Sequence, residues 1–169
     1  MTKIDYEKFL EGTARDDKDR TVGQLLSWDG NFFRLEYTHY YIQRLFPLPD
    51  ASGADKSLRP AAEEELARIR INDAAKRNIS LAYGMMLRFW QLDGGKYKDP
   101  SLRRHWVKRS GKDHNLRRIS RVLKCLKLLG MSEYDDFALR VRYLLGLSEK
   151  GQFPLCRETK HVWNSILLD

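Results

Sequence analysis

The sequence predicts an all-α fold, a single compact and irregular bundle of about eight helices. Apolar residues recur at three- and four-residue intervals through most of the chain, the spacing that gathers them on one face of a helix. No segment shows the sustained alternation that is typical of a strand. A chain of 169 residues suits one domain and can enclose a hydrophobic core, so we assign residues 1–169 to a single helical domain.

The first two predicted helices are short. Tyr6, Phe9 and Leu10 fall at helical spacing and indicate a helix near the N-terminus. Thr21 is a residue type that caps helix N-termini, and it predicts a second helix that runs through Leu26.

A longer amphipathic pattern predicts one helix over residues 32–46. Its inward-facing stripe consists of Phe32, Leu35, His39, Ile42 and Phe46. Pro47 ends this helix, because proline lacks an N–H group and clashes with the preceding turn.

Two helices are predicted in the middle of the chain. Pro60 can occupy the first turn of the earlier one, where its missing N–H is harmless, and glutamates 63–65 place negative charge near the positive helix end. Asn72 is the expected N-cap of the later one. The apolar stripe of that later helix contains Ala75, Ile79, Ala82 and Met86.

Four helices are predicted in the last third. Residues 102–109 form a short basic helix, and a strongly amphipathic helix follows that Gly130 ends. Ser132 and Asp135 resemble a capping box that opens the next helix. The final helix carries Val162, Trp163 and Ile166.

Composition limits the possible classes of function. The 31 Lys and Arg against 23 Asp and Glu give a net charge of +8, which permits nucleic acid, anionic membrane or acidic protein partners. Cys125 and Cys156 fit neither a disulfide framework nor a zinc site, so both are expected to be reduced thiols. No apolar run approaches the length of a transmembrane helix and no signal core opens the chain, so a cytoplasmic protein is expected.

Two ordered blocks of residues resemble a known family. The first block contains Leu35-Glu36, His39, Tyr41-Ile42-Gln43 and Leu45-Phe46-Pro47. The second block contains His114-Asn115, Arg117-Arg118-Ile119, Arg121, Leu126 and Leu129-Gly130. In order and spacing these blocks resemble the conserved N-terminal domain of the opioid growth factor receptor family. The chain departs from the family pattern at Arg44, where the family usually has Trp.

The resemblance implies a receptor-like module that binds a peptide or protein. More loosely, it implies binding of an opioid pentapeptide, a role in restraining growth, and a nuclear or membrane-associated location as alternatives to the cytoplasm. The family supplies no catalytic residues.

Glu36, His39 and Gln43 form the first candidate site. On a continuous helix His39 would turn inward, and a buried imidazole needs hydrogen-bond partners. Glu36 and Gln43 lie three residues before and four residues after it, which is within reach. The set is either a polar network that fixes core packing or the polar floor of a ligand pocket.

Asn115 and Arg118 extend this candidate polar set. Asn115 stands at the start of a predicted helix, so we interpret it as the N-cap. Arg118 aligns with the buried side of that helix and is expected to pair with an acid such as Glu36.

The segment 102–127 is the second candidate site, because Asp113 is its only acidic residue among ten Lys and Arg. The candidate anion-binding residues are Arg103, Arg104, Arg117, Arg121 and Lys124. Such a run is either a solvated basic face or a surface for phosphates or acidic peptides.

The leading hypothesis is therefore a peptide- or protein-binding module. The alternatives are nucleic-acid binding through segment 102–127 and an uncharacterised enzyme with a pocket near His39. The chain has no glycine-rich phosphate loop, no Cys-x-x-Cys and no histidine spacing for a metal. We accordingly predict no cofactor, no metal site and no enzymatic activity.

Overall fold

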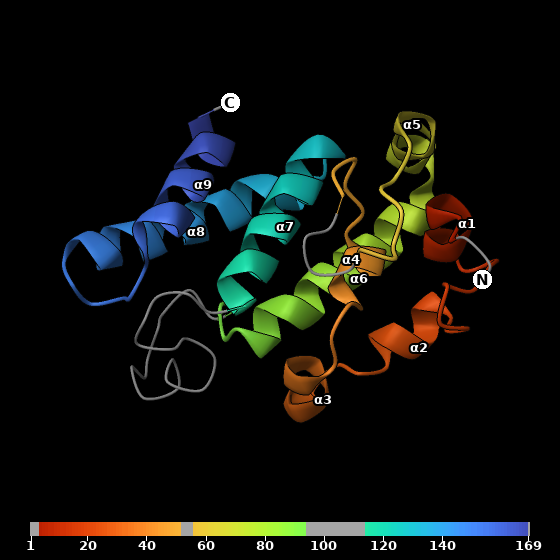
Figure 1. Cartoon of the computed structure of the whole chain (residues 1–169), viewed down its shortest axis with the longest axis horizontal. Helices are drawn as coiled ribbons and strands as arrows, with labels where there is room; N and C mark the ends of the chain where they lie inside the picture. The colour runs from red at the N-terminus through yellow and green to blue at the C-terminus, as the bar shows by residue number, and fades with distance from the viewer. Residues whose placement is uncertain (1–3, 52–55, 94–113, 169) are drawn as a thin grey trace.

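The computed structural model describes residues 4–51, 56–93 and 114–168, and over these ranges the fold is all-α, as predicted (Figure 1). No strand occurs within them, and none of their helices is long and apolar enough to cross a membrane. The basic helix expected at 102–109 lies outside the described residues. In chain order the helices are α1 (Tyr6–Glu11), α2 (Val22–Leu26), α3 (Phe32–Tyr37), α4 (Ile42–Leu45), α5 (Glu63–Ile71), α6 (Asp73–Phe89), α7 (His114–Leu128), α8 (Glu133–Glu149) and α9 (Arg157–Leu168).

Helix α6 crosses the centre of the molecule and organises the packing (Figure 1). Helices α1, α2 and α5 contact it, while α7, α8 and α9 contact one another. Aromatic rings join the two groups: the centroid of Phe137 on α8 lies 5.3 Å from that of Tyr83 and 6.0 Å from that of Trp90. The buried hydrophobic side chains consequently form one continuous cluster.

Side-chain caps set several helix ends where the sequence indicated them. Thr21 and Gln24 form a reciprocal capping box at the start of α2. Asn72 accepts a hydrogen bond from the main-chain N–H of Ala75 at 3.0 Å, which confirms it as the cap of α6. Gly130 ends the α7 segment with a φ of 63°, a left-handed conformation that glycine adopts without a steric penalty.

The prediction of one helix over 32–46 is wrong. Helix α3 ends at Tyr37 and α4 begins at Ile42. Between them Tyr40 has a φ of +71°, and a right-handed helix cannot continue through that conformation. The break lets the Tyr41 side chain turn into the core, where its hydroxyl donates to the carbonyl of Leu35 at 3.2 Å.

Two predicted helix starts also need correction. Helix α5 begins at Glu63 rather than near Pro60, because the Glu65 carboxylate accepts the N–H of Ala62 and fixes the first turn there. Ser132 does not cap the main chain of α8; its hydroxyl instead donates to the side chain of Glu133 at 3.0 Å.

Candidate functional site

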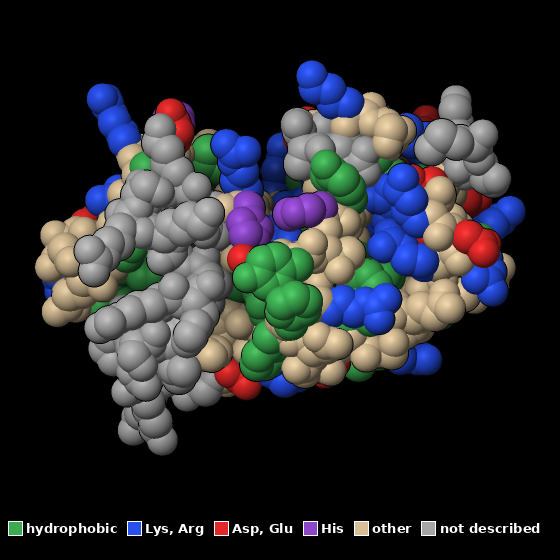
Figure 2. All heavy atoms as spheres, turned by 60° about the horizontal axis from the view of Figure 1, so that its bottom comes forward, with side chains coloured by type: hydrophobic (Ala, Val, Ile, Leu, Met, Phe, Trp, Pro, Cys, Tyr) green, Lys and Arg blue, Asp and Glu red, His purple; other side chains and the backbone are tan. Residues whose placement is uncertain are grey.

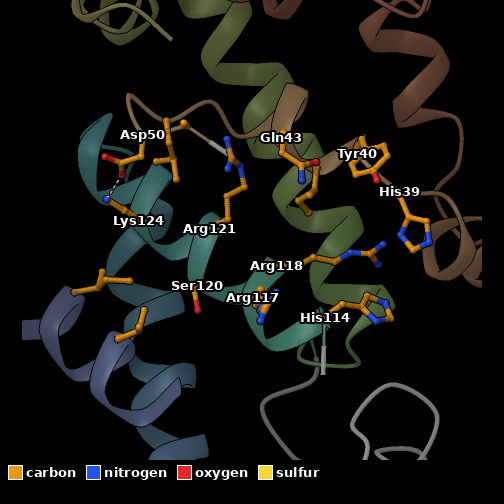
Figure 3. A pocket seen from close by; sticks show the side chains of 15 residues that line it. His39, Tyr40, Gln43, Asp50, His114, Arg117, Arg118, Ser120, Arg121 and Lys124 are labelled. Carbon is orange, nitrogen blue, oxygen red and sulfur yellow. Dashed lines mark hydrogen bonds and ion pairs between the residues drawn. The ribbon is translucent and has the colours of Figure 1, made fainter. Parts of the chain in front are cut away.

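A pocket of about 410 Å³ opens between α4, α7 and α9 (Figure 3). Ile42, Leu48, Val162 and Ile166 form the aliphatic part of its lining, the aliphatic wall, and four of the remaining residues are Lys or Arg. The residues that line it are His39, Tyr40, Ile42, Gln43, Leu48, Asp50, Ala51, His114, Arg117, Arg118, Ser120, Arg121, Lys124, Val162 and Ile166. Its volume lies within the range of small-molecule and peptide side-chain sites.

Helix α9 forms part of the aliphatic wall because Trp163 anchors it on α7. Trp163 is fully buried, and its indole N–H donates to the hydroxyl of Ser120 at 2.8 Å. The carbonyl of Ile166 accepts a hydrogen bond from Lys127 at 2.6 Å. These contacts hold Val162 and Ile166 at the pocket.

The charged lining comprises four cations and one carboxylate, and the cations differ in their partners. Lys124 pairs with Asp50, the one acid of the lining. Arg117 is exposed and makes no hydrogen bond or ion pair with the residues that the structure describes. The potential in the pocket is therefore positive, which favours an anionic group on the ligand.

Arg121 is the cation best placed to bind such a group. Its Nε donates to the carbonyl of Phe46 at 2.9 Å, and no residue in the described ranges binds its two terminal nitrogens. Burial lowers the pKa of this guanidinium below its usual range, and the nearby Arg44 cation adds to the effect. An anion bound there would relieve this unfavourable burial of charge.

Gln43 lies beside these cations with unused hydrogen-bonding capacity. Its side chain projects from α4, and only 6% of the residue is exposed. The buried Oε1 has no hydrogen-bond partner among the described residues. In the view of Figure 3, Gln43 lies between the guanidinium groups of Arg121 and Arg118. Buried polar atoms are normally satisfied, so this oxygen marks a position where a donor is missing.

Arg118 holds the pocket's framework together. It is buried, as predicted, and its Nη1 donates to the carbonyl of Leu35 at 2.9 Å while Nη2 donates to that of Thr38 at 3.2 Å. Its contact with Glu36 is to the main-chain carbonyl, at 3.4 Å, rather than the expected carboxylate. Arg118 thereby ties α7 to the end of α3.

Asn115 is not a helix cap. It is fully buried, and its Nδ2 donates to the Glu36 carboxylate at 2.9 Å. Its Oδ1 accepts from Arg118 at 3.1 Å and from the indole of Trp90 at 3.5 Å. Asn115 is therefore the centre of a buried polar network that joins α3, α6 and α7.

His39 does not face the core, contrary to the prediction. The break at Tyr40 leaves His39 exposed at the mouth of the pocket, where its ring centroid lies 6.3 Å from that of His114. The Glu36 carboxylate lies 3.2 Å from Nε2 of His114 and accepts from Asn115 instead of joining His39. Figure 2 shows histidine side chains beside a group of hydrophobic ones on this face, close to Lys and Arg.

Several predicted site residues lie in this one pocket. Those that line it are His39, Gln43, Arg117, Arg118, Arg121 and Lys124. Glu36 and Asn115 lie behind the lining as supports, and Arg103 and Arg104 lie outside the described residues. Sequence reasoning missed the aliphatic wall, because Leu48 and Ile166 have the pattern of ordinary core residues. Within the described ranges, no cluster of three or more potential metal ligands is present.

Most of the region that forms the pocket matches a known family. The profile of the opioid growth factor receptor conserved region covers residues 10–162. The chain belongs to this family. It is similar to opioid growth factor receptor-like protein 1 of Mus musculus, with 33% identity over 67% of the chain and 25% of that protein. It is also similar to opioid growth factor receptor-like protein 1 of Xenopus tropicalis, with 30% identity over 67% of the chain and 22% of that protein.

The opioid growth factor receptor of Homo sapiens is similar as well, with 28% identity over 72% of the chain and 18% of that protein. The chain thus spans about a quarter or less of the length of these relatives. No solved structure matches it. Family membership agrees with the resemblance that the two sequence blocks indicated.

Proposed function

We propose that the chain is a peptide- or protein-binding module, and that its ligand binds in the pocket between α4, α7 and α9. The observation that carries the proposal is the pocket's lining, which combines aliphatic side chains with four cations, among them Arg121 with two terminal nitrogens unbound by the described residues. Pockets of this kind bind ligands that combine apolar groups with a few charged groups, as peptides do.

Two further observations support the proposal. The relatives are named as receptors of an opioid growth factor or as similar to them, which favours a binding role over catalysis and suggests an opioid pentapeptide as a first ligand to test. The polar network around Asn115 and Arg118 holds the lining in place without using the free nitrogens of Arg121. A site whose groups are already positioned loses less entropy when the ligand binds.

The test is retention of pentapeptides by the immobilised chain. A randomised pool and an opioid pentapeptide are passed over the wild-type chain, Arg121→Gln and Arg77→Gln. Arg77 is an exposed cation on α6 outside the pocket, so its variant is a matched control for lost charge. We expect peptides that the wild type and Arg77→Gln retain and that Arg121→Gln binds at least about tenfold more weakly, since hydrogen bonds to charged groups contribute roughly 1.5–3 kcal/mol. Equal retention by all three, or by none, contradicts the proposal.

Nucleic-acid binding is the second candidate, because Arg117 and Lys124 are both exposed on α7. A single-stranded oligonucleotide used in the same assay separates the two. Phosphate binding releases counterions and weakens steeply with salt. Retention of the oligonucleotide at low salt, its loss at high salt and no retention of peptides would favour this second candidate.

A further inference from the structure

We infer that the pocket recognises the free C-terminal residue of a peptide or protein, with the terminal carboxylate on Arg121 and the last main-chain N–H on Gln43 Oε1. This inference rests on the proposed function and names the part of the ligand that enters the pocket. It is carried by three features: an anchored guanidinium with its terminal nitrogens unused, a buried oxygen without a donor, and an aliphatic wall beside them.

Arg121 has the geometry for a carboxylate. Its Nε donates to the carbonyl of Phe46 at 2.9 Å, which orients the guanidinium, and Nη1 and Nη2 have no partner among the described residues. Two parallel N–H groups match the two oxygens of a carboxylate. Two of the other lining cations are occupied, because Arg118 binds main-chain carbonyls and Lys124 binds Asp50.

Gln43 restricts which anion fits. Its Oε1 is buried and accepts hydrogen bonds, so in the orientation that the structure shows, a ligand satisfies it by placing a donor close to the negative charge. A fully ionised phosphate or an isolated carboxylate offers acceptors alone. The C-terminal residue of a peptide has its N–H and its carboxylate on the same Cα, and it satisfies Gln43 and Arg121 together.

The aliphatic wall accommodates the side chain of that last residue. Ile42 and Leu48 line it from α4 and the following loop, and Val162 and Ile166 line it from α9. Burial of an apolar side chain there is favourable at about 25 cal/mol per Å² of area removed from water. We therefore expect an aliphatic C-terminal residue, with Arg117 at the rim attracting additional acidic groups.

The experiment compares two matched pools of N-acetylated random pentapeptides, one with free C-terminal carboxylates and one with C-terminal amides. Both are applied to the wild-type chain, Arg121→Lys, Gln43→Met and the Arg77→Gln control. Lysine keeps the charge but loses the paired N–H groups. Methionine keeps the length of Gln43 and removes the unsatisfied amide oxygen. Thermal melting of each variant is measured in parallel.

We expect the wild type and Arg77→Gln to retain the acid pool at least about tenfold better than the amide pool, and both site variants to lose this preference. Peptides with aliphatic last residues should be enriched. Gln43→Met should melt at the same or a higher temperature, because it removes a buried unsatisfied polar atom. A residue with a purely structural role would lower the melting temperature instead.

Other outcomes overturn the inference in distinguishable ways. If the wild type retains both pools equally and Arg121→Lys retains neither, the pocket binds peptides without recognising the C-terminal carboxylate. The proposed function is then supported and the C-terminal inference is rejected. Retention of neither pool rejects C-terminal recognition together with peptide binding. Displacement of the acid pool by inorganic phosphate, with no effect of Gln43→Met, means that Arg121 binds anions without discrimination.

Discussion

Arg44 is fully buried and binds both carboxylate oxygens of Asp17, with Nε donating to Oδ1 and Nη2 donating to Oδ2, each at 2.6 Å. Its Nη1 donates to the carbonyl of Tyr40, the residue that breaks the helical pattern. Asp16 lies 3.6 Å from Arg44 and pairs with Arg20. Arg44 is thus the centre of a buried ionic network.

Removal of Arg44 should be strongly destabilising. Arg44→Ala leaves the Asp17 carboxylate buried without its partner, so we expect the free energy of unfolding to fall by about 3–5 kcal/mol. Arg88→Ala is the matched control, because Arg88 pairs with Asp29 and both side chains are at least 40% exposed; its effect should stay below about 1 kcal/mol. Urea unfolding measures both. Similar small losses in the two variants would contradict the role assigned to Arg44.

Asn115 should be essential to the stability of the polar network. Asn115→Ala deprives Trp90, Arg118 and Glu36 of a buried partner, and each group left unsatisfied costs about 1–3 kcal/mol. Asn164→Ala, at an exposed position on α9, should change stability by less than about 0.5 kcal/mol. Chemical denaturation compares the two, and equal midpoints would contradict the stabilising role assigned to the network around Asn115.

Glu65 should make stability depend on pH in the acid range. Burial acts to raise its pKa, but the guanidinium of Arg59 and the N–H groups of Ala62 and Tyr6 outweigh burial and hold the pKa below its usual value. A lowered folded-state pKa contributes stability that is present above the unfolded pKa of about 4.3 and is lost as pH falls through the folded value.

Two variants isolate this contribution. Glu65→Gln should reduce stability at neutral pH and flatten its decline below about pH 4.3. Glu64→Gln removes an exposed charge from the same turn and should keep the wild-type decline. The measurement is the urea midpoint across the acid range; parallel curves for wild type and Glu65→Gln would exclude the predicted linkage.

The two cysteines should react at different rates. Hydrogen bonds from the Thr159 side chain and main chain lower the pKa of the Cys156 thiol, and its Sγ lies 3.2 Å from Thr159 Oγ1. Burial raises the pKa of Cys125 to about 12. Thiolates are the reactive form, so iodoacetamide should modify Cys156 in the folded chain and leave Cys125 intact.

The pH profile of alkylation identifies the cause. Thr159→Val should shift the Cys156 profile to higher pH and slow the reaction at neutral pH, whereas Cys156→Ser should abolish labelling of the folded chain. Peptide mass mapping locates the label. Modification of Cys125 at a comparable rate would show that α7 opens readily, and an unchanged profile in Thr159→Val would reject the hydrogen-bond explanation.

Local signals predicted much of the fold because they act within one helix. The Asn72 cap and the apolar stripe of α6 depend on residues three or four positions apart, so both can be recognised from the sequence. The break at Tyr40 cannot be recognised in this way, because it depends on a distant group. Arg44 donates to the Tyr40 carbonyl and is itself bound by Asp17, 27 residues away.

Several residues of the pocket lining were predicted from their types, but their arrangement was not. Both family-like blocks supply lining residues, and the basic side of α7 was visible from helical spacing. The roles within that helix were not visible, since Asn115 and Arg118 are distinguished from Arg121 only by partners on other elements. The sequence offered no reason to connect Val162 and Ile166 with the pocket.

Because α9 supplies part of the lining, the pocket is complete only after α9 has docked on α7. The other lining elements precede residue 125, whereas Val162 and Ile166 join the lining only when Trp163 has inserted against Ser120. In a nascent chain with only α1–α8 folded, the pocket would already contain the cations of α7, but the side that α9 covers would be open to water. If the proposed ligand binds this pocket, it would bind chains with α9 docked more tightly than chains without it, and so would stabilise the docking of α9.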